Sequence, residues 1–331
     1  DRVPRRLREP SMQYRALGST GLTVSAVGFG GWGIGGRTGG ATSYGPTDDA
    51  QSRRALARAF DCGITFFDTS PAYGDGHSER LIGEAFRGNR ESVVIATKAG
   101  YRSWTAAPDY APAAIRASVE GSLRRLGTGH IDLLQLHNPP PALLRARPEI
   151  VETLNALARQ GLIRAWGISA KSPDDGVAAI REFGAGAVQA NLNMLDVRAV
   201  SGGLAVAAAA AGAAIIARTP LCFGFLGGSV TDATAFAPGD HRAAWPERQR
   251  ARWREGAEMV FSRAVPASGA ARAEAALRFC LAAPAVATVI PGILTPEEAA
   301  TNAAAGALPP LPAAQYEAVL ALNREHDFFV R

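Results

Sequence analysis

The sequence predicts a parallel (β/α)8 barrel, the TIM-barrel class of α/β fold. Short runs rich in β-branched and aromatic residues alternate with helical patterns along the 331-residue chain, which is typical of parallel strands joined by crossover helices. Eight such runs can be counted, and eight units close a barrel. No shift in composition marks a second domain, so a single barrel domain is expected over residues 12–331.

Each expected strand is followed by a helix or a helix-like segment. The strands are residues 24–28, 64–68, 93–98, 131–137, 165–169, 187–191, 213–217 and 286–290. The first helix is expected to begin after Thr47 as its N-cap, to carry Leu56 and Phe60 on one face, and to end at Gly63. Gly127 and Gly161 are expected to end two later helices in the same way.

Two stretches depart from the regular spacing. Residues 221–268 form a long loop after the seventh strand, and loops of this length are usually functional lids or mobile segments. Residues 1–11 contain four arginines and no apolar run. We therefore expect them to be a leader or a remnant outside the fold, with Met12 as the natural start.

An open, doubly wound sheet is the structural alternative, because the spacing alone does not forbid it. Residues 28–33 also match G-x-G-x-x-G, the dinucleotide fingerprint of that class. That fingerprint requires a helix immediately after it. Here the chain continues through Gly35, Gly36 and Pro46, which favours a flexible exit from a strand. The barrel is therefore the preferred prediction.

Composition argues against several classes of partner. The formal charge of +5 comes from basic residues spread along the expected helices, so nucleic-acid binding is not expected. The longest strongly apolar stretch, residues 204–217, is shorter than the ~20 residues that a membrane span needs. Three cysteines without metal-ligand spacing favour a reducing cytoplasm. A small-molecule substrate remains as the expected partner, and the oligomeric state is left open.

Four polar residues stand near the ends of the expected strands. Asp68, Lys98 and His137 end the second, third and fourth strands, and Tyr73 lies in the loop after Asp68. Each alone has an ordinary explanation, such as a helix cap or a core residue. Because the carboxyl ends of barrel strands form the active face, the four together predict a catalytic group.

These side chains suit proton donation to a carbonyl oxygen. A phenol is a poor acid at neutral pH unless positive charge stabilises its phenolate, and Lys98 would supply that charge. Asp68 would keep Lys98 ionised, and His137 would hydrogen-bond the substrate oxygen or the phenol. The sequence shows no nucleophile elbow and no metal-ligand spacing, so the electrons would come as hydride from a nicotinamide.

The motifs around these residues resemble those of the aldo-keto reductases. The matching segments are residues 28–31, 67–74, 77–79, 95–98, 132–137, 167–169, 189 and 290–292. The resemblance implies an NAD(P)H-dependent oxidoreductase that reduces an aldehyde or ketone to an alcohol, or the reverse. It also implies a catalytic tetrad of Asp68, Tyr73, Lys98 and His137, and a hairpin of residues 14–17 and 22–26 that closes the base of the barrel.

The resemblance further implies a cofactor lying extended over the strand ends, usually NADPH. Ser169 and Gln189 would hold its carboxamide, Arg218 would face the nicotinamide, and Asn302 would contact the adenine. The implied cofactor contacts are Gly30, Gly31, Trp32, Asp68, Ser169, Gln189, Arg218, Pro220, Leu221, Gly224, Leu226, Pro291, Gly292, Leu294, Glu298 and Asn302.

This chain departs from that pattern where the family often grips the 2′-phosphate of NADP. Gly292, Ile293 and Glu298 replace basic or hydroxyl residues there, and a carboxylate near that phosphate would repel it. Ala170 replaces an asparagine beside the carboxamide, and Ser229 stands where a lysine is common. We therefore expect NADP(H) as the family cofactor, with NAD(H) tolerated better than in typical relatives.

Aromatic residues suggest a substrate pocket formed by Trp32, Tyr73, Tyr101, Trp104 and His137. Three further rings, Tyr110, Trp245 and Trp253, could line the same pocket. The alternative is that half of the six aromatic residues Trp32, Tyr101, Trp104, Tyr110, Trp245 and Trp253 only anchor loops. Two alternative functions stay open. One is a cofactor-bound regulatory or binding subunit that does not reduce, and the other is an isomerase or lyase that uses Tyr73 and His137 for proton transfer.

Overall fold

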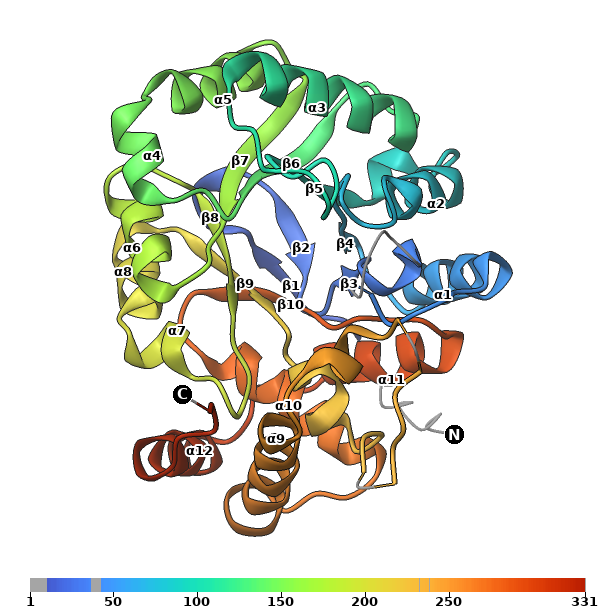
Figure 1. Cartoon of the computed structure of the whole chain (residues 1–331), viewed down its shortest axis with the longest axis vertical. Coiled ribbons are helices and arrows are strands. Elements are labelled where there is room, and N and C mark those ends of the chain that lie inside the picture. The colour runs from blue at the N-terminus through green and yellow to red at the C-terminus, as the bar shows by residue number, and fades with distance from the viewer. Residues whose placement is uncertain (1–10, 37–42, 232, 238, 331) are drawn as a thin grey trace, which may run out of the picture.

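The computed structural model describes residues 11–36, 43–231, 233–237 and 239–330. The expectation that residues 1–11 form a leader lies outside these ranges, apart from the exposed Ser11. Figure 1 looks along a ring of strands with helices around it. Among the described residues, no helix has both the length and the apolar character to cross a membrane.

Eight parallel strands form the barrel, paired in chain order from β3 to β10. They are β3 (Phe29–Gly30), β4 (Phe66–Asp68), β5 (Val94–Ala99), β6 (Ile131–His137), β7 (Ile163–Ser169), β8 (Ala187–Asn191), β9 (Ala214–Arg218) and β10 (Val286–Ile290). Parallel bridges Val27–Val289 and Gly30–Gly292 join the two edge strands. The barrel prediction is therefore confirmed.

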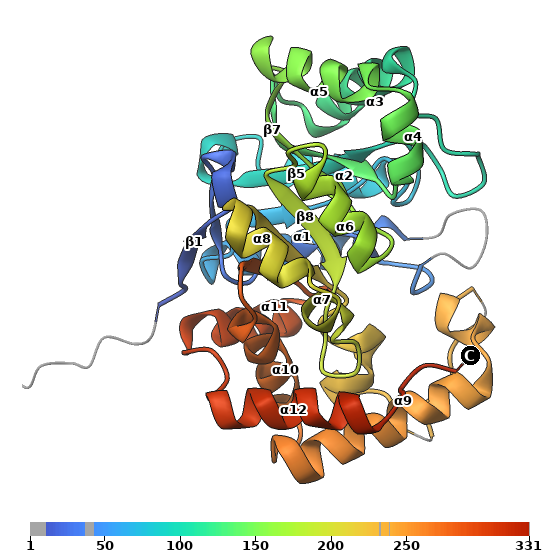
Figure 2. The same ribbon diagram turned by 90° about the vertical axis from the view of Figure 1, so that its left-hand side faces the viewer.

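A two-stranded antiparallel hairpin lies across the base of the barrel. It consists of β1 (Tyr14–Ala16) and β2 (Thr23–Ser25). Leu17, Leu22 and Val24 of the hairpin pack with apolar residues from the lower ends of the strands. Gly18 has a φ of +55°, and a Cβ on it would lie 2.6 Å from the Gly186 carbonyl oxygen, so the turn can press against the strands. Figure 2 shows the hairpin at the end opposite α9.

The expected barrel strand at residues 24–28 is wrong in its placement. Thr23–Ser25 belongs to the hairpin, and the first barrel strand is Phe29–Gly30. Only three residues separate these two strands, and residues 24–30 are all buried. Because even the polar Ser25 in this stretch is buried, the pattern does not show where one strand ends and the next begins. The other seven strands lie within three residues of their expected bounds.

Helices connect successive strands on the outside of the barrel. They are α1 (Asp49–Asp61), α2 (His77–Ala85), α3 (Pro112–Leu126), α4 (Pro141–Ala146), α5 (Glu149–Arg159), α6 (Pro173–Arg181), α7 (Arg198–Ser201), α8 (Leu204–Ala211), α10 (Ala270–Ala282) and α11 (Pro296–Ala307). Gly63, Gly127 and Gly161 all adopt positive φ at helix ends, as expected. The N-cap of α1 is Asp48, not Thr47, because the Asp48 side chain accepts a hydrogen bond from the Gln51 amide.

The long segment after β9 is structured. It contains 3-10 turns, including Cys222–Gly227 and His241–Ala244, and then α9 (Glu247–Met259). Its Trp253 is buried and lies 5.8 Å from Phe329, ring centre to ring centre, beyond the last helix α12 (Ala313–Glu325). The C-terminal end of the chain therefore packs against this segment, as Figure 2 shows.

Candidate active site

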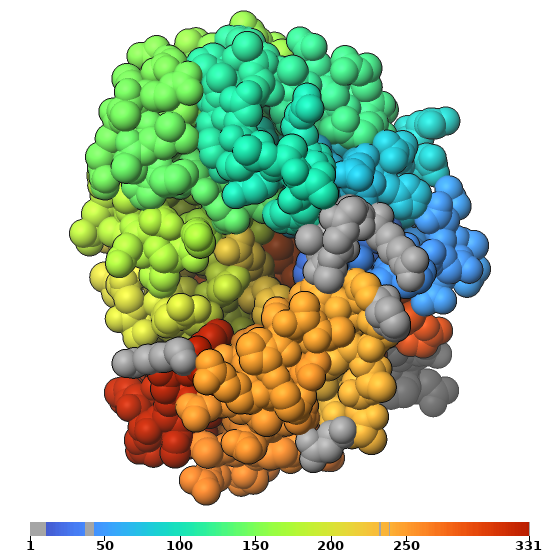
Figure 3. All heavy atoms as spheres, viewed as in Figure 1, coloured from blue at the N-terminus to red at the C-terminus, as the bar shows by residue number. Residues whose placement is uncertain are grey.

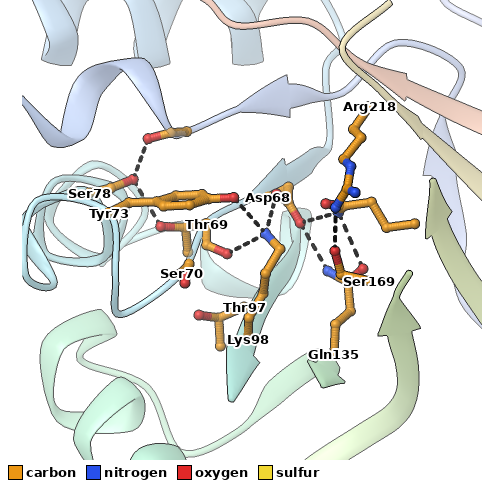
Figure 4. A network of polar contacts seen from close by, with 12 residues as sticks. Asp68, Thr69, Ser70, Tyr73, Ser78, Thr97, Lys98, Gln135, Ser169 and Arg218 are labelled. Atoms are coloured by element: carbon orange, nitrogen blue, oxygen red, sulfur yellow. Dashed lines mark hydrogen bonds and ion pairs between the residues drawn. The ribbon is translucent and has the colours of Figure 1, made fainter. Parts of the chain in front are cut away.

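Polar side chains converge at the upper end of the barrel interior, opposite the hairpin. Asp68 and His137 are the last residues of β4 and β6, and Lys98 is the penultimate residue of β5. All three are at most 3% exposed. Tyr73 follows β4 in the loop, and Figure 4 shows its hydroxyl and Asp68 on either side of the Lys98 amine. The structure thus brings the four expected residues together.

The Lys98 ammonium has three hydrogen-bond acceptors for its three hydrogens. Its Nζ donates to Asp68 Oδ1 at 2.6 Å, to the Thr69 carbonyl at 2.9 Å and to Tyr73 Oη at 3.2 Å. Burial opposes the charge on Lys98, but Asp68 and Tyr73 outweigh burial and raise the pKa of this lysine. Lys98 is therefore a fixed cation that points at the phenol oxygen.

Tyr73 keeps its proton in this environment. Burial raises the pKa of the Tyr73 phenol above its ordinary value, with Lys98 acting in the opposite direction and Asp68 adding to the rise. The expected effect of Lys98 is thus present in direction, but burial outweighs it. Because Nζ donates to Oη, the phenol's own hydrogen remains available for another acceptor.

His137 is neutral at physiological pH. Burial, with smaller contributions from the charges of Lys98 and Arg218, holds the pKa of His137 well below its usual value. Its Nδ1 is buried and has no hydrogen-bond partner in the described part of the chain. Tyr101 and Trp104 lie 5.2 and 5.4 Å from the His137 ring, centre to centre. The imidazole therefore faces an aromatic wall beside Tyr73.

The second oxygen of Asp68 is bound by two amides. Gln135 Nε2 donates to Asp68 Oδ2 at 2.9 Å and Gln189 Nε2 at 2.8 Å. Gln189 was expected at the site, but Gln135 was not. A simple pattern identifies it: Gln135 precedes His137 by two residues on β6, so both side chains point to the same face of the strand.

A groove of about 620 Å³ runs from these residues across the strand ends. Figure 3 shows the hollow between the green-to-teal part of the surface and the orange α9 segment. The expected residues that line the groove are Gly30, Trp32, Asp68, Tyr73, Gln189, Arg218, Pro220, Leu221, Gly224, Pro291, Gly292, Leu294, Glu298 and Asn302. One end of the groove is at the tetrad and the other is at the first half of α11.

Three expected cofactor contacts, Gly31, Ser169 and Leu226, are buried and are not among the residues that line the groove. Gly31 and Leu226 are buried in the fold. Ser169 is fully buried, and its Oγ accepts a hydrogen bond of 2.6 Å from Arg218 Nη1. The structure therefore holds Ser169 through Arg218, whose guanidinium also donates to Asn191 Oδ1 and to the Ala170 carbonyl.

Comparison with known proteins agrees with this geometry. The profile described as Aldo/keto reductase family matches residues 26–324. The chain is 34% identical over 250 residues to aldo-keto reductase YhdN of Bacillus subtilis, covering 74% of this chain and 72% of that one. It is 32% identical over 256 residues to the NADH-specific methylglyoxal reductase of Escherichia coli, covering 72% and 76%.

A solved structure shows the same architecture. The holo form of aldo-keto reductase AKR11C1 from Bacillus halodurans superimposes with a TM-score of 0.77 at 26% identity, covering 94% of this chain and 96% of that one. The chain belongs to the aldo-keto reductase family. It is accordingly an oxidoreductase, and the comparisons favour neither the regulatory-subunit nor the isomerase alternative.

In this aldo-keto reductase the far end of the groove carries carboxylates. Glu298 caps α11, since its Oε2 accepts hydrogen bonds from the amides of Leu294 and Thr295 at 2.7 and 3.3 Å. The Thr295 hydroxyl accepts one from the Glu298 amide in return. Glu297 lines the groove beside it. The capping bonds fix the Glu298 carboxylate at the groove.

Other groove residues were not anticipated from the sequence. They include Tyr44 and Arg242. Arg242 donates to both carboxylate oxygens of Asp240, and its guanidinium lies 4.8 Å from the Tyr44 ring centre. Tyr44 and Arg242 are about 200 residues apart in the chain, and nothing local in the sequence links them.

The expected aromatic pocket of this aldo-keto reductase separates into two groups. Tyr101 and Trp104 lie beside His137, and the Trp104 ring is 6.3 Å from the Tyr73 ring. Trp32 instead lies 4.6 Å from His241, ring centre to ring centre. His241 belongs to the β9–α10 segment, which is the connection of residues 219–269 between β9 and α10. Trp32 lines the groove all the same.

The three further rings are anchors, which was the alternative weighed from the sequence. Tyr110 is buried, and its hydroxyl donates to the His137 carbonyl at 2.5 Å. Trp245 and Trp253 pack against each other at 4.9 Å within the β9–α10 segment. Among the described residues, no group of three or more histidine, cysteine, aspartate or glutamate side chains is placed to hold a metal ion.

Proposed function

We propose that this aldo-keto reductase reduces an aldehyde or ketone to an alcohol with NAD(P)H, and that Tyr73 is its general acid. One observation carries the assignment. Lys98 Nζ donates to Tyr73 Oη, so the phenol is polarised by a cation and its hydrogen points elsewhere. A carbonyl oxygen placed against Oη would receive that hydrogen.

The groove fits an extended nicotinamide dinucleotide. It joins the tetrad to Asn302, and Gln189 and Arg218 offer amide and guanidinium groups at the catalytic end. When bound there, the reduced nicotinamide supplies hydride to the carbonyl carbon. We propose that Gln189 faces the carboxamide, beside the Ser169 that Arg218 binds, and that Asn302 faces the adenine.

The remaining residues bind and orient the substrate. Neutral His137 would donate a hydrogen bond to the carbonyl oxygen, since its low pKa keeps it from carrying a second positive charge next to Lys98. Asp68 holds Lys98 in place through the 2.6 Å contact. Tyr101 and Trp104 would enclose the organic part of the substrate and exclude water from Oη.

The proposal is tested by measuring NADH and NADPH oxidation with a panel of aldehydes, ketones and α-dicarbonyls. We expect saturable turnover with at least one carbonyl, and its loss in Lys98→Met, which keeps the length of the side chain without its charge. Glu317→Gln, on the exposed side of α12, is the control. Dinucleotide binding without oxidation by any carbonyl would contradict the proposal and favour the regulatory-subunit alternative.

We further propose that this enzyme accepts NAD(H) at least as well as NADP(H). Glu298 and Glu297 both line the adenosine end of the groove, and their charges would repel a 2′-phosphate. Of the arginines that line the groove, Arg218 is at the catalytic end, and Arg242 lies beside Gly224 and is paired with Asp240. The relative from Escherichia coli that is named NADH-specific is a precedent within the family.

Glu298→Gln tests this preference with little disturbance, because the glutamine Oε1 can still accept from the Leu294 amide. Removing one negative charge near the 2′-phosphate should improve NADP(H) affinity by ~3–10-fold and leave NAD(H) affinity nearly unchanged. Titration of protein fluorescence gives both dissociation constants. A strong preference of the wild-type protein for NADPH would refute the proposal.

The three cysteines support a proposed cytoplasmic location. Cys62, Cys222 and Cys280 are all free thiols, and Cys222 and Cys280 are buried. Free thiols persist in a reducing compartment.

A further inference from the structure

Gln135 is a buried polar residue next to Asp68 that the proposed mechanism does not yet use. It is fully buried on β6 and pairs in register with Lys98 of β5. Its Nε2 donates to Asp68 Oδ2, the oxygen that Lys98 does not bind. Gln135 therefore contacts the carboxylate that holds the catalytic cation, from the side away from that cation.

Gln189 shares the same acceptor. Its Nε2 donates to Asp68 Oδ2 at 2.8 Å and to Gln135 Oε1 at 3.2 Å. An amide nitrogen has two hydrogens, so both hydrogens of Gln189 are used inside the barrel. Gln189 also lines the groove. It can turn an N–H toward a ligand in the groove only by giving up one of these two bonds.

We propose that Gln135 is a positioning residue that keeps Asp68 Oδ2 hydrogen-bonded and thereby frees one Gln189 N–H to donate to the carboxamide oxygen of the dinucleotide. The inference rests on the proposed function, in which Gln189 faces the carboxamide. A buried carboxylate oxygen left without a donor is costly, so Gln189 can leave Asp68 only if another donor stays. Gln135 is that donor, and it affects cofactor binding only through Asp68 and Gln189.

The structure places Gln135 well for this role. The neighbouring strand position in register is Gly167 of β7, where a Cβ would lie 2.4 Å from the Ala187 carbonyl oxygen. At this position β7 carries no side chain and its backbone lies close to that of β8. The contact of 3.2 Å between Gln189 Nε2 and Gln135 Oε1 joins side chains of β8 and β6.

A double-mutant cycle with Gln135→Met and Gln189→Met tests the proposal, because methionine keeps side-chain length without the amide. Gln135→Met should weaken NADH binding about tenfold, since Gln189 becomes the sole amide donor to Asp68. In the Gln189→Met background, adding Gln135→Met should leave the NADH dissociation constant unaltered. The reason is that the Gln189 amide, which would have to choose between Asp68 and the dinucleotide, is already absent. Binding is followed by quenching of protein fluorescence, so the readout does not depend on turnover.

Equal losses in both backgrounds, or no loss in Gln135→Met, would overturn the proposal. Circular dichroism and the melting temperature show whether each variant is folded. If Gln135→Met does not fold, Gln135→Asn provides the same comparison, since its amide falls short of Asp68 by one methylene. A wild-type protein that binds neither nicotinamide would refute the proposed function itself, whereas a binding wild type with an additive cycle refutes only the role of Gln135.

Discussion

The lower and upper halves of the barrel interior are built from the same strands but differ in character, since the lower half is apolar and the upper half is polar. In four strands an apolar inward residue is followed two positions later by a polar one. These pairs are Phe66 and Asp68 in β4, Ala96 and Lys98 in β5, Leu133 and Gln135 in β6, and Ala187 and Gln189 in β8. The lower set packs against the hairpin, and the upper set forms the hydrogen-bonded network of Figure 4.

This difference separates stability from activity along each strand. Burying apolar surface in the lower half, the floor of the barrel, stabilises the fold. Burying the Asp68–Lys98 ion pair does not in general stabilise the fold, because the cost of removing both charges from water offsets their attraction. We infer that the floor supports the fold and that the network above it is retained for chemistry.

The largest expected effect is in the upper half. Tyr73→Phe removes the proposed proton donor and hardly changes the shape of the site, so carbonyl reduction should fall by ~10²-fold or more. Cofactor affinity should stay within about twofold of wild type, because the phenol oxygen is not needed to fill the groove. Steady-state kinetics and fluorescence titration measure the two quantities. Near-normal turnover would mean that another group donates the proton.

The next effect is in the lower half. Leu133→Ala leaves a cavity beneath the network and should lower the free energy of unfolding by ~2–5 kcal/mol, while turnover per folded molecule changes little. Val206→Ala is the matched control, because Val206 is 67% exposed on α8 and its truncation should cost less than ~0.5 kcal/mol. Chemical denaturation provides the comparison. A variant of Leu133 that is stable but inactive would contradict the separation of the two halves.

The smallest expected effect is the response of carbonyl reduction to pH. Burial raises the pKa of Tyr73, so the phenol keeps its proton throughout the neutral range and reduction should be nearly flat there. The rate should fall only as pH rises through that raised pKa. Alcohol oxidation needs the phenolate and should instead increase with pH. A reduction rate that declines with a midpoint below the ordinary phenol value of ~10 would contradict this account.

Most of the barrel could be predicted from local patterns. Strand ends such as Asp68 and His137 were identifiable because a polar residue closes an apolar run, and Gly127 and Gly161 mark helix ends through their positive φ. The boundary between β2 and β3 could not be placed, since every residue from Val24 to Gly30 is buried, including the polar Ser25.

The convergence of the four residues was predictable for the same reason as the strands, because Asp68, Lys98 and His137 lie at or next to a strand end and Tyr73 lies in the loop after β4. The groove was less predictable from the sequence. Tyr44, Arg242 and Phe223 come together only when the β9–α10 segment folds back over the barrel. Gln135 was overlooked because a single buried amide within an apolar strand has no chemistry of its own until Asp68 and Gln189 lie beside it.

The hairpin imposes an order on assembly. Its residues Leu17 and Val24 are synthesised before the barrel strands, yet their packing partners include Ala214 and Ala287, and Val27 pairs with Val289. The base of the barrel is therefore completed only after β10 has been synthesised. Contacts of such long sequence separation slow folding and leave apolar segments exposed for longer, so the nascent chain should depend on chaperones until β10 is released.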